Sequence, residues 1–124
     1  MVELTARSGR DVSSAELAGL LGVSRESVYQ LLLPLARAGF VRVGRGRNGG
    51  YRAAPGAGEL SVAAVVEPFD RGDGERARAQ TGPPYVTDLE RRAAEASRRV
   101  LAATRVGELA AAVRASREAL SWEI

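Results

Sequence analysis

The stretch AELAGLLGVSRESVYQLL, residues 15–32, contains two apolar stripes separated by a glycine. The first stripe consists of Leu17, Leu20 and Leu21, and the second of Val28, Leu31 and Leu32, which continues to Leu35 just beyond the stretch. Both have helical spacing. Ala18 is small where two helices must approach closely, and Gly22 tolerates the positive φ of a tight turn. The pattern predicts a helix-turn-helix, although an ordinary helical hairpin would place similar residues at these spacings.

Polar residues mark where each of these helices begins. The segment SSAE is a capping box, in which Ser13 accepts a hydrogen bond from the Glu16 amide and Glu16 reaches back to the Ser13 amide. Ser24 is the expected cap of the second helix. Pro34 lacks the amide that a helix interior requires, so we expect the second helix to kink or break near Leu33.

A basic, glycine-rich segment, RVGRGRNGGYR at residues 42–52, follows and holds no acidic residue. FVRV (40–43) and GYRA (50–53) predict two strands, and Asn48-Gly49 is a strong hairpin-turn signal. A helix-turn-helix followed by such a ribbon is a winged helix. The glycines would let the ribbon tip approach another polymer, and the arginines suit phosphates and a narrow minor groove. A solvated arginine-rich turn is the alternative.

Composition restricts the chemistry. The 124 residues include 18 basic and 15 acidic side chains, and the net charge is +3. The absence of cysteine and histidine excludes disulfides, thiolate zinc sites, cysteine-ligated clusters and histidine acid–base catalysis. No nucleophile–base pair, phosphate loop or metal-ligand cluster is visible, so we expect no enzyme, cofactor or metal. Without a membrane-spanning run or a signal-peptide core, we expect a cytoplasmic protein with no membrane contact.

The chain beyond the ribbon divides into a short helix, a polar segment and a helical region. ELSVAAVVEP predicts a helix that Ser61 caps and that ends before Pro68. A Gly/Pro-rich polar segment follows it. We therefore expect a winged helix-turn-helix DNA-binding domain at residues 1–69, a loop or linker at 70–86 and a helical dimerisation region at 87–124.

The helical region carries a seam at heptad spacing. TDLE is a second capping box and predicts a helix start at Thr87. The seam consists of Leu89, Ala93, Ala96 and Val100, and it is the candidate dimer contact. A last helix is expected after Thr104 or Gly107. The alternative is that the seam packs on its own winged helix.

The run SSAELAGLLGVSRESVYQLLLPLARAGFVRVGRGRNGGYRAA (13–54), followed by ELSVAAVVEP, resembles the Rrf2 family of bacterial transcription regulators. The most specific part is L-x-x-AGF-V leading into RG-x-x-GGY-R. Relatives of this kind include the iron–sulfur cluster regulator and the cysteine-metabolism repressor, and many hold a cluster through three cysteines in the loop before a long helix. This chain has no cysteine, so cluster sensing is excluded.

The resemblance implies a mainly α fold with a small β-wing, that is, a winged helix-turn-helix with C-terminal dimerisation helices. It also implies that the second helix of the motif enters the major groove and that the wing contacts the minor groove. Base reading then falls on Arg25, Ser27 and Tyr29, and wing contacts fall on Arg45, Arg47 and Asn48. The whole candidate DNA-binding set is Ser24, Arg25, Ser27, Tyr29, Gln30, Arg42, Arg45, Arg47 and Asn48.

These features predict a sequence-specific DNA-binding transcriptional regulator, expected to be a repressor, that acts as a homodimer without an iron–sulfur cluster. Two-fold symmetry would place the recognition helices about 34 Å apart on a palindromic duplex site. The signal stays open between an unidentified small molecule, a partner protein and none. The alternative function is a winged-helix protein-interaction module with no DNA role, whose wing would contact an acidic partner.

Overall fold

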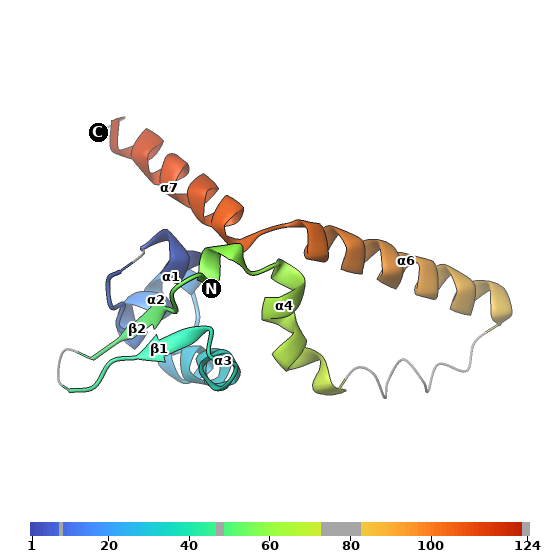
Figure 1. Cartoon of the computed structure of the whole chain (residues 1–124), viewed down its shortest axis with the longest axis horizontal. Helices are drawn as coiled ribbons and strands as arrows, with labels where there is room; N and C mark the ends of the chain where they lie inside the picture. Colours follow the sequence, from blue (N-terminus) through green and yellow to red (C-terminus); the bar gives the residue numbers. More distant parts are fainter. Residues whose placement is uncertain (8, 47–48, 73–82, 123–124) are drawn as a thin grey trace.

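The computed structural model describes residues 1–7, 9–46, 49–72 and 83–122. Its helices are α1 (Val2–Ala6), α2 (Ser14–Leu21), α3 (Arg25–Arg37), α4 (Val62–Val66), α6 (Pro84–Ala103) and α7 (Val106–Trp122). Its strands are β1 (Val41–Val43) and β2 (Tyr51–Ala53), and its 3-10 helices are η1 (Ala57–Glu59) and η2 (Glu67–Gly72). Figure 1 shows a mainly helical chain with one small hairpin, as the sequence predicts.

The first three helices pack around one apolar core. The buried core residues are Leu4, Val12, Leu17, Val28, Leu32, Leu35 and Val41. Between α2 and α3, Gly22 adopts a left-handed φ of 65°, which a residue with a side chain rarely tolerates. The turn is closed by a 3.1 Å hydrogen bond from the Val23 amide to the Ala18 carbonyl. This tight connection makes α2 and α3 a helix-turn-helix, as predicted.

The cap of α2 follows the prediction only in part. The Ser13 hydroxyl accepts a hydrogen bond from the Glu16 amide at 3.1 Å. The predicted hydrogen bond from the Ser13 amide to the Glu16 carboxylate is wrong. That carboxylate pairs with Arg10 instead and lies 3.4 Å from Nε of Arg7. Charge-assisted contacts to two arginines are stronger than a bond to a neutral amide, so they draw the carboxylate away from the cap.

Helix α3 passes through Pro34 without a break, so the expected break near Leu33 is wrong, while the alternative of a kink there stays a prediction. Proline has a φ that suits a helix, and its missing amide leaves one carbonyl, four residues earlier, without its usual donor. That carbonyl belongs to Gln30, which is exposed. Water can therefore satisfy it, and the helix tolerates the proline.

The wing is a short hairpin joined to the body at its base. β1 and β2 are antiparallel, with Val41 opposite Ala53 and Val43 opposite Tyr51. Val12 adds a further rung, because its amide and carbonyl each bond to Tyr51 at 2.8 Å. Val41 is buried in the core with α3. The hairpin is therefore held from both sides, and its described residues beyond the strands lead away from the body (Figure 1).

Helix α4 forms where the sequence predicts a short helix. The Ser61 hydroxyl caps it by accepting a 3.2 Å hydrogen bond from the Ala64 amide. α4 ends at Val66, before Pro68, and the chain continues as η2. Part of the expected linker is thus helical, and residues 73–82 lie outside the described residues.

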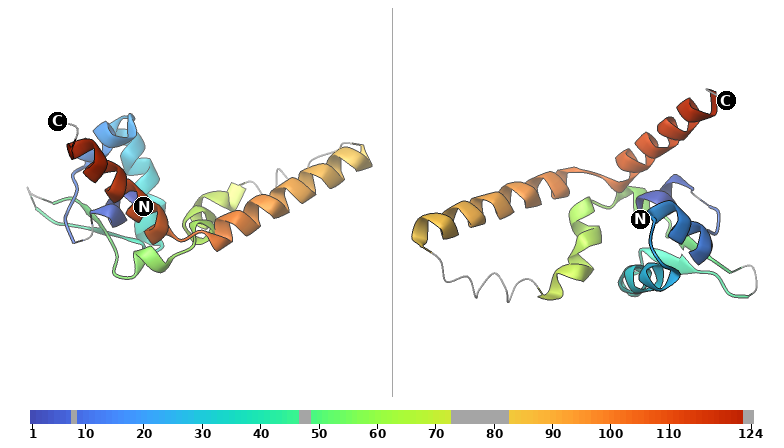
Figure 2. Two further views of the ribbon diagram at one scale, coloured as in Figure 1. Left: turned by 90° about the horizontal axis from the view of Figure 1, so that it is seen from above. Right: turned by 180° about the vertical axis from the view of Figure 1, so that it is seen from behind.

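Helix α6 projects from the body as an arm, whereas α7 returns to it. α7 packs against α1 and η1, and α6 packs mainly against α4; both views of Figure 2 show the arm extending outward. The predicted start at Thr87 is wrong: α6 begins at Pro84, where a proline has no amide to leave unpaired. Within the described residues, no helix is both long and apolar enough to cross a membrane.

Candidate nucleic-acid interface

The first turn of α3 is fixed by a serine pair and exposes side chains suited to base edges. Ser24 Oγ accepts a hydrogen bond from the Ser27 amide at 3.1 Å, and the two hydroxyl oxygens lie 2.9 Å apart. Arg25, Tyr29 and Gln30 are exposed, Tyr29 by 54%. Arginine and glutamine can each make paired hydrogen bonds to a base edge in the major groove. The geometry therefore brings all five predicted α3 residues to one helix end.

Arg45 lies in the wing loop, directly after a backbone hydrogen bond that extends the hairpin. The Gly44 amide donates to the Gly50 carbonyl at 2.7 Å, which continues the ladder past the strands. Arg45 follows directly and is exposed. Arg47 and Asn48 lie outside the described residues, so their roles rest on the sequence alone.

Arg42 does not share a face with α3. Successive strand residues point to opposite faces of a hairpin. Because Val41 is buried with α3, Arg42 points the other way, directly opposite Arg52 of β2. Arg52 in turn binds Asp11 through two hydrogen bonds, Nε to Oδ1 at 2.6 Å and Nη2 to Oδ2 at 2.9 Å. The DNA-binding role of Arg42 stays a prediction, and its position separates it from the α3 residues.

The Asp11–Arg52 pair anchors the wing beside the Val12 rung. The hydrogen bond from Arg52 lowers the pKa of Asp11 below its ordinary value, and the same bond raises the pKa of Arg52. These residues stand 41 positions apart, and sequence reasoning missed both. Nothing local marks them as partners, because their contact depends on how the hairpin docks. The pair therefore joins β2 to the segment that precedes α2.

Three exposed arginines of α3 and the wing pair with no carboxylate among the described residues. Within the described residues, Arg25, Arg42 and Arg45 take part in no ion pair. Arg7, in contrast, pairs with Glu3 on the other side of the body. An unpaired exposed guanidinium keeps its full charge available for an external anion, and duplex DNA offers a dense row of phosphates. The surface can therefore bind a polyanion.

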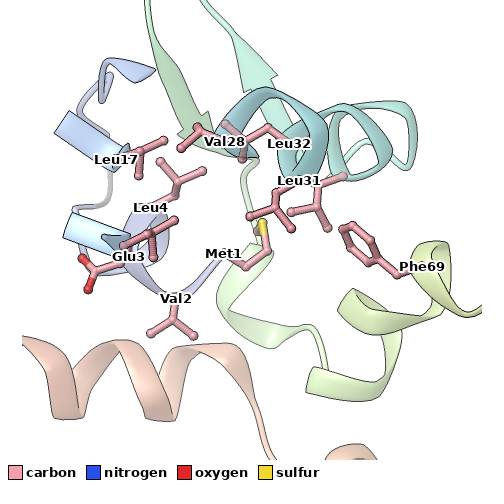
Figure 3. A pocket seen from close by; sticks show the side chains of 11 residues that line it. Met1, Val2, Glu3, Leu4, Leu17, Val28, Leu31, Leu32 and Phe69 are labelled. Atoms are coloured by element: carbon pink, nitrogen blue, oxygen red, sulfur yellow. The ribbon is translucent and has the colours of Figure 1, made fainter. Parts of the chain in front are cut away.

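A cavity of about 320 Å³ lies behind α3. Its walls come from α1, α2, α3 and η2 and are almost entirely apolar, with Leu31 and Phe69 among them (Figure 3). Two charged groups border it, the carboxylate of Glu3 and the terminal ammonium of Met1, whose pKa burial lowers. Partial burial acts to raise the pKa of Glu3, but hydrogen bonds from Arg7 and Arg117 outweigh it and lower the pKa. Because the Glu3 carboxylate is already paired and burial disfavours the charged form of the Met1 amine, the remaining walls of the cavity suit an apolar group.

Comparisons with known proteins agree with this arrangement. A family profile described as Rrf2, iron-dependent transcriptional regulator, matches residues 1–112. The crystal structure of oxidized Staphylococcus aureus CymR is 28% identical, with a TM-score of 0.70, covering 88% of this chain and 85% of that one. CymR of B. subtilis, the global cysteine regulator, is 24% identical, with a TM-score of 0.70 and coverage of 89% and 86%. T. potens IscR is 19% identical, with a TM-score of 0.68 and coverage of 99% and 82%.

This chain lacks the side chains that hold an iron–sulfur cluster. Iron–sulfur clusters are held by cysteine thiolates, with histidine replacing some of them in certain proteins. The 124 residues contain neither cysteine nor histidine. The part of the chain that the structure describes also holds no group of three or more carboxylates that could bind a metal ion. The residues present therefore do not fit an iron–sulfur cluster.

Proposed function

Because this chain belongs to the Rrf2 family of DNA-binding transcriptional regulators, we propose that it is a homodimeric repressor that occupies a palindromic promoter site. Members of this family are regulators and not enzymes. Membership also favours a DNA role over the interaction module considered from the sequence. The observation that carries the proposal is the group of exposed polar side chains at the start of α3, which includes Arg25, together with the exposed Arg45 of the wing; neither arginine is in an ion pair within the described residues.

We assign base reading to the start of α3 and backbone contact to the wing. Arg25, Tyr29 and Gln30 would meet base edges in the major groove, where the N-terminal residues of a recognition helix bind. Ser27 would join them at the base edges, and Ser24 would contact a phosphate beside them, since hydroxyls at a helix start commonly do so. Arg45, with Arg47 and Asn48, would reach the adjacent minor groove.

The two faces of α6 support dimerisation through the seam. Ala94, Ser97 and Leu101 line a cleft that α6 forms with α4. Leu89 and Val100, in contrast, are 64% and 65% exposed. The seam therefore does not pack on its own winged helix, which contradicts that alternative. An exposed apolar stripe on a projecting helix suits pairing with the same stripe of a second copy.

An antiparallel pairing of the two α6 helices explains the arm's length. A helix of 20 residues spans about 30 Å. The winged helix is attached at the C-terminal end of α6, so antiparallel arms place the two winged helices at opposite ends. The length of the paired arms then sets the separation of the two winged helices, for which a palindromic site requires about one DNA turn, roughly 34 Å. This pairing also sets Leu89 against Val100 of the second copy, and Ala93 against Ala96.

For the signal, we propose an uncharged apolar small molecule bound in the cavity behind α3. Leu31 and Val28 line this cavity from the recognition helix itself, so an occupant would change how α3 rests on the body. A panel of uncharged hydrocarbons and phenols should include compounds that raise the melting temperature and alter DNA affinity. Leu31→Trp, which fills the cavity, should abolish both effects. The proposed effector class is wrong if no compound changes either quantity.

Selection of bound sequences from random duplex DNA tests the central proposal. We expect a palindrome whose half-sites lie about one turn apart. Arg25→Ala and Tyr29→Ala should reduce discrimination between this site and random DNA more than they reduce non-specific binding. Absence of binding to any duplex at low ionic strength would contradict the DNA role. Transcription in vitro from a promoter bearing the site should fall on adding the protein, and a rise would contradict the repressor role.

A further inference from the structure

The junction between the arm and α7 is joined to the body by backbone hydrogen bonds. The Val62 amide donates to the Thr104 carbonyl at 2.9 Å, and the Val106 amide donates to the Leu60 carbonyl at 3.0 Å. Arg105 adds a side-chain bond to the Glu59 carbonyl at 3.1 Å. We call this pairing of residues 60–62 with 104–106 the elbow clamp. It holds the C-terminal end of α6 against the segment that precedes α4.

A glycine pair makes the elbow clamp tight. A Cβ added at Gly107 would lie only 2.9 Å from the Gly58 carbonyl oxygen, which is backbone and cannot rotate away. Gly107 has no positive φ, so glycine is not required there for backbone conformation. Its absence of a side chain instead lets α7 and η1 approach closely. Glycine at this position is therefore explained by contact.

We propose that the elbow clamp sets the direction in which α6 leaves the winged helix, and thereby the half-site spacing that the dimer recognises. This inference rests on the homodimer proposed above. An alanine Cβ at residue 107 would have to move by roughly 0.5 Å to reach an ordinary distance from the Gly58 carbonyl oxygen. Because Gly107 is one Cα–Cα step, about 3.8 Å, from the elbow clamp, this shift corresponds to a tilt of the chain of about 7° at the clamp. Along an arm of about 30 Å this moves the far end by roughly 4 Å, more than the rise of one base pair, about 3.4 Å.

The test uses the full chain and a series of duplexes in which the spacer between the two selected half-sites varies by single base pairs. Two variants disturb the clamp in different ways. Gly107→Ala introduces the clash, and Val62→Pro removes one hydrogen bond at the first residue of α4, where proline suits the helix. We expect each variant to move or flatten the spacing optimum by at least one base pair, while affinity for an isolated half-site stays within about twofold.

Matched controls separate positioning from general damage. Gly19→Ala adds a methyl group in α2 where nothing lies within 4 Å, and Val62→Ala keeps the amide. Both should retain the wild-type optimum. If the clamp variants do not fold, Arg105→Ala removes only the exposed contact to Glu59 and is expected to shift the optimum in the same way.

The outcomes are distinguishable. A clamp variant that is folded and dimeric but keeps the wild-type optimum, or loses affinity equally at every spacing, would overturn the inference. A wild-type dimer that binds DNA without any spacing preference would overturn it as well. If the wild-type chain binds no duplex, the proposed function itself fails, and the inference falls with it. Sedimentation and thermal unfolding establish the folded and dimeric state in each case.

Discussion

At the residue scale, Gly50 is required by contact with the protein itself. A Cβ at Gly50 would lie 2.8 Å from the Val12 carbonyl oxygen, beside the rung that joins Val12 to Tyr51. We expect Gly50→Ala to separate these backbones and lower the free energy of unfolding by about 1–3 kcal/mol, the usual cost of overpacking. Urea denaturation of both proteins measures the difference.

The control for this change is Gly19→Ala, in an exposed turn of α2 with open space around it. Alanine is a better helix former than glycine there, so stability should rise by up to about 1 kcal/mol. If Gly50→Ala were as stable as the wild type, the docking of the wing on Val12 would be wrong. The sequence suggested that glycine brings the ribbon close to another polymer, but at Gly50 the close neighbour is Val12.

Asp11 makes the wing anchor dependent on pH. The hydrogen bond from Arg52 lowers the pKa of Asp11, so the pair stabilises the fold above the unfolded value of about 3.9 and is lost as pH falls through the lower folded value. Asp11→Asn should therefore have a lower melting temperature than the wild type at neutral pH. The gap should close as pH falls below about 4, through the lowered pKa of Asp11.

Thermal unfolding across this pH range checks the expectation. Glu90→Gln removes a carboxylate from the exposed arm and leaves the anchor intact, so it is the matched control. A gap that stays constant down to about pH 2 would show that the Asp11 carboxylate does not provide the stability.

At the scale of elements, local signals predicted most of the fold. Serine caps and apolar spacing located α2, α3 and α4, because those signals act within a few residues of the helix that they mark. The failures share a cause. Both concern a proline whose effect depends on its surroundings. The predicted break at Pro34 fails because Gln30 is exposed, and the predicted helix start at Thr87 fails because the helix begins at Pro84. Neither circumstance is visible in a local sequence pattern.

The candidate site also contains residues that local sequence patterns predict and residues that they do not. The exposed residues of α3 follow from helical spacing, so Arg25, Tyr29 and Gln30 were predictable. The anchor could not be predicted, because Asp11 and Arg52 meet only when the hairpin docks on the body. The strand alternation that turns Arg42 away from α3 was implicit in the sequence, but it needed Val41 to be placed in the core first.

The wing should act through charge, which its salt dependence reveals. Replacing Arg45 by alanine removes an exposed guanidinium that has no ion-pair partner within the described residues. If it contacts one phosphate, the slope of log affinity against log salt should become shallower by about 0.9. Fluorescence anisotropy with the selected duplex over a range of salt concentrations measures this slope.

Arg114→Ala is the control for that measurement. Arg114 is exposed on α7, away from the wing, and its loss changes the net charge equally. Its slope should match the wild type. Equal changes in both variants would mean that the overall charge, and not contact by the wing, determines the salt dependence.

At the scale of the whole molecule, the projecting arm is the feature that an isolated copy leaves unexplained. Globular proteins seldom leave a helix of this length exposed on an apolar face. Tyr85, Leu89 and Val100 are all more than 60% exposed along α6, with values of 76%, 64% and 65%. The elbow clamp holds this arm away from the winged helix. Both features follow if the arm is half of an interface whose other half is a second copy.

That argument predicts which face of α6 controls assembly. Ala93→Glu places a carboxylate at the centre of the seam, where pairing would bury it without a partner. Ala102→Glu makes the same chemical change at an exposed alanine on the opposite face of the same helix. We expect Ala93→Glu to raise the dimer dissociation constant at least tenfold, or about 1.4 kcal/mol, and Ala102→Glu to leave it within about twofold. Sedimentation equilibrium measures both, and a dimer that tolerates Ala93→Glu but dissociates in Ala102→Glu would place the interface on the other face.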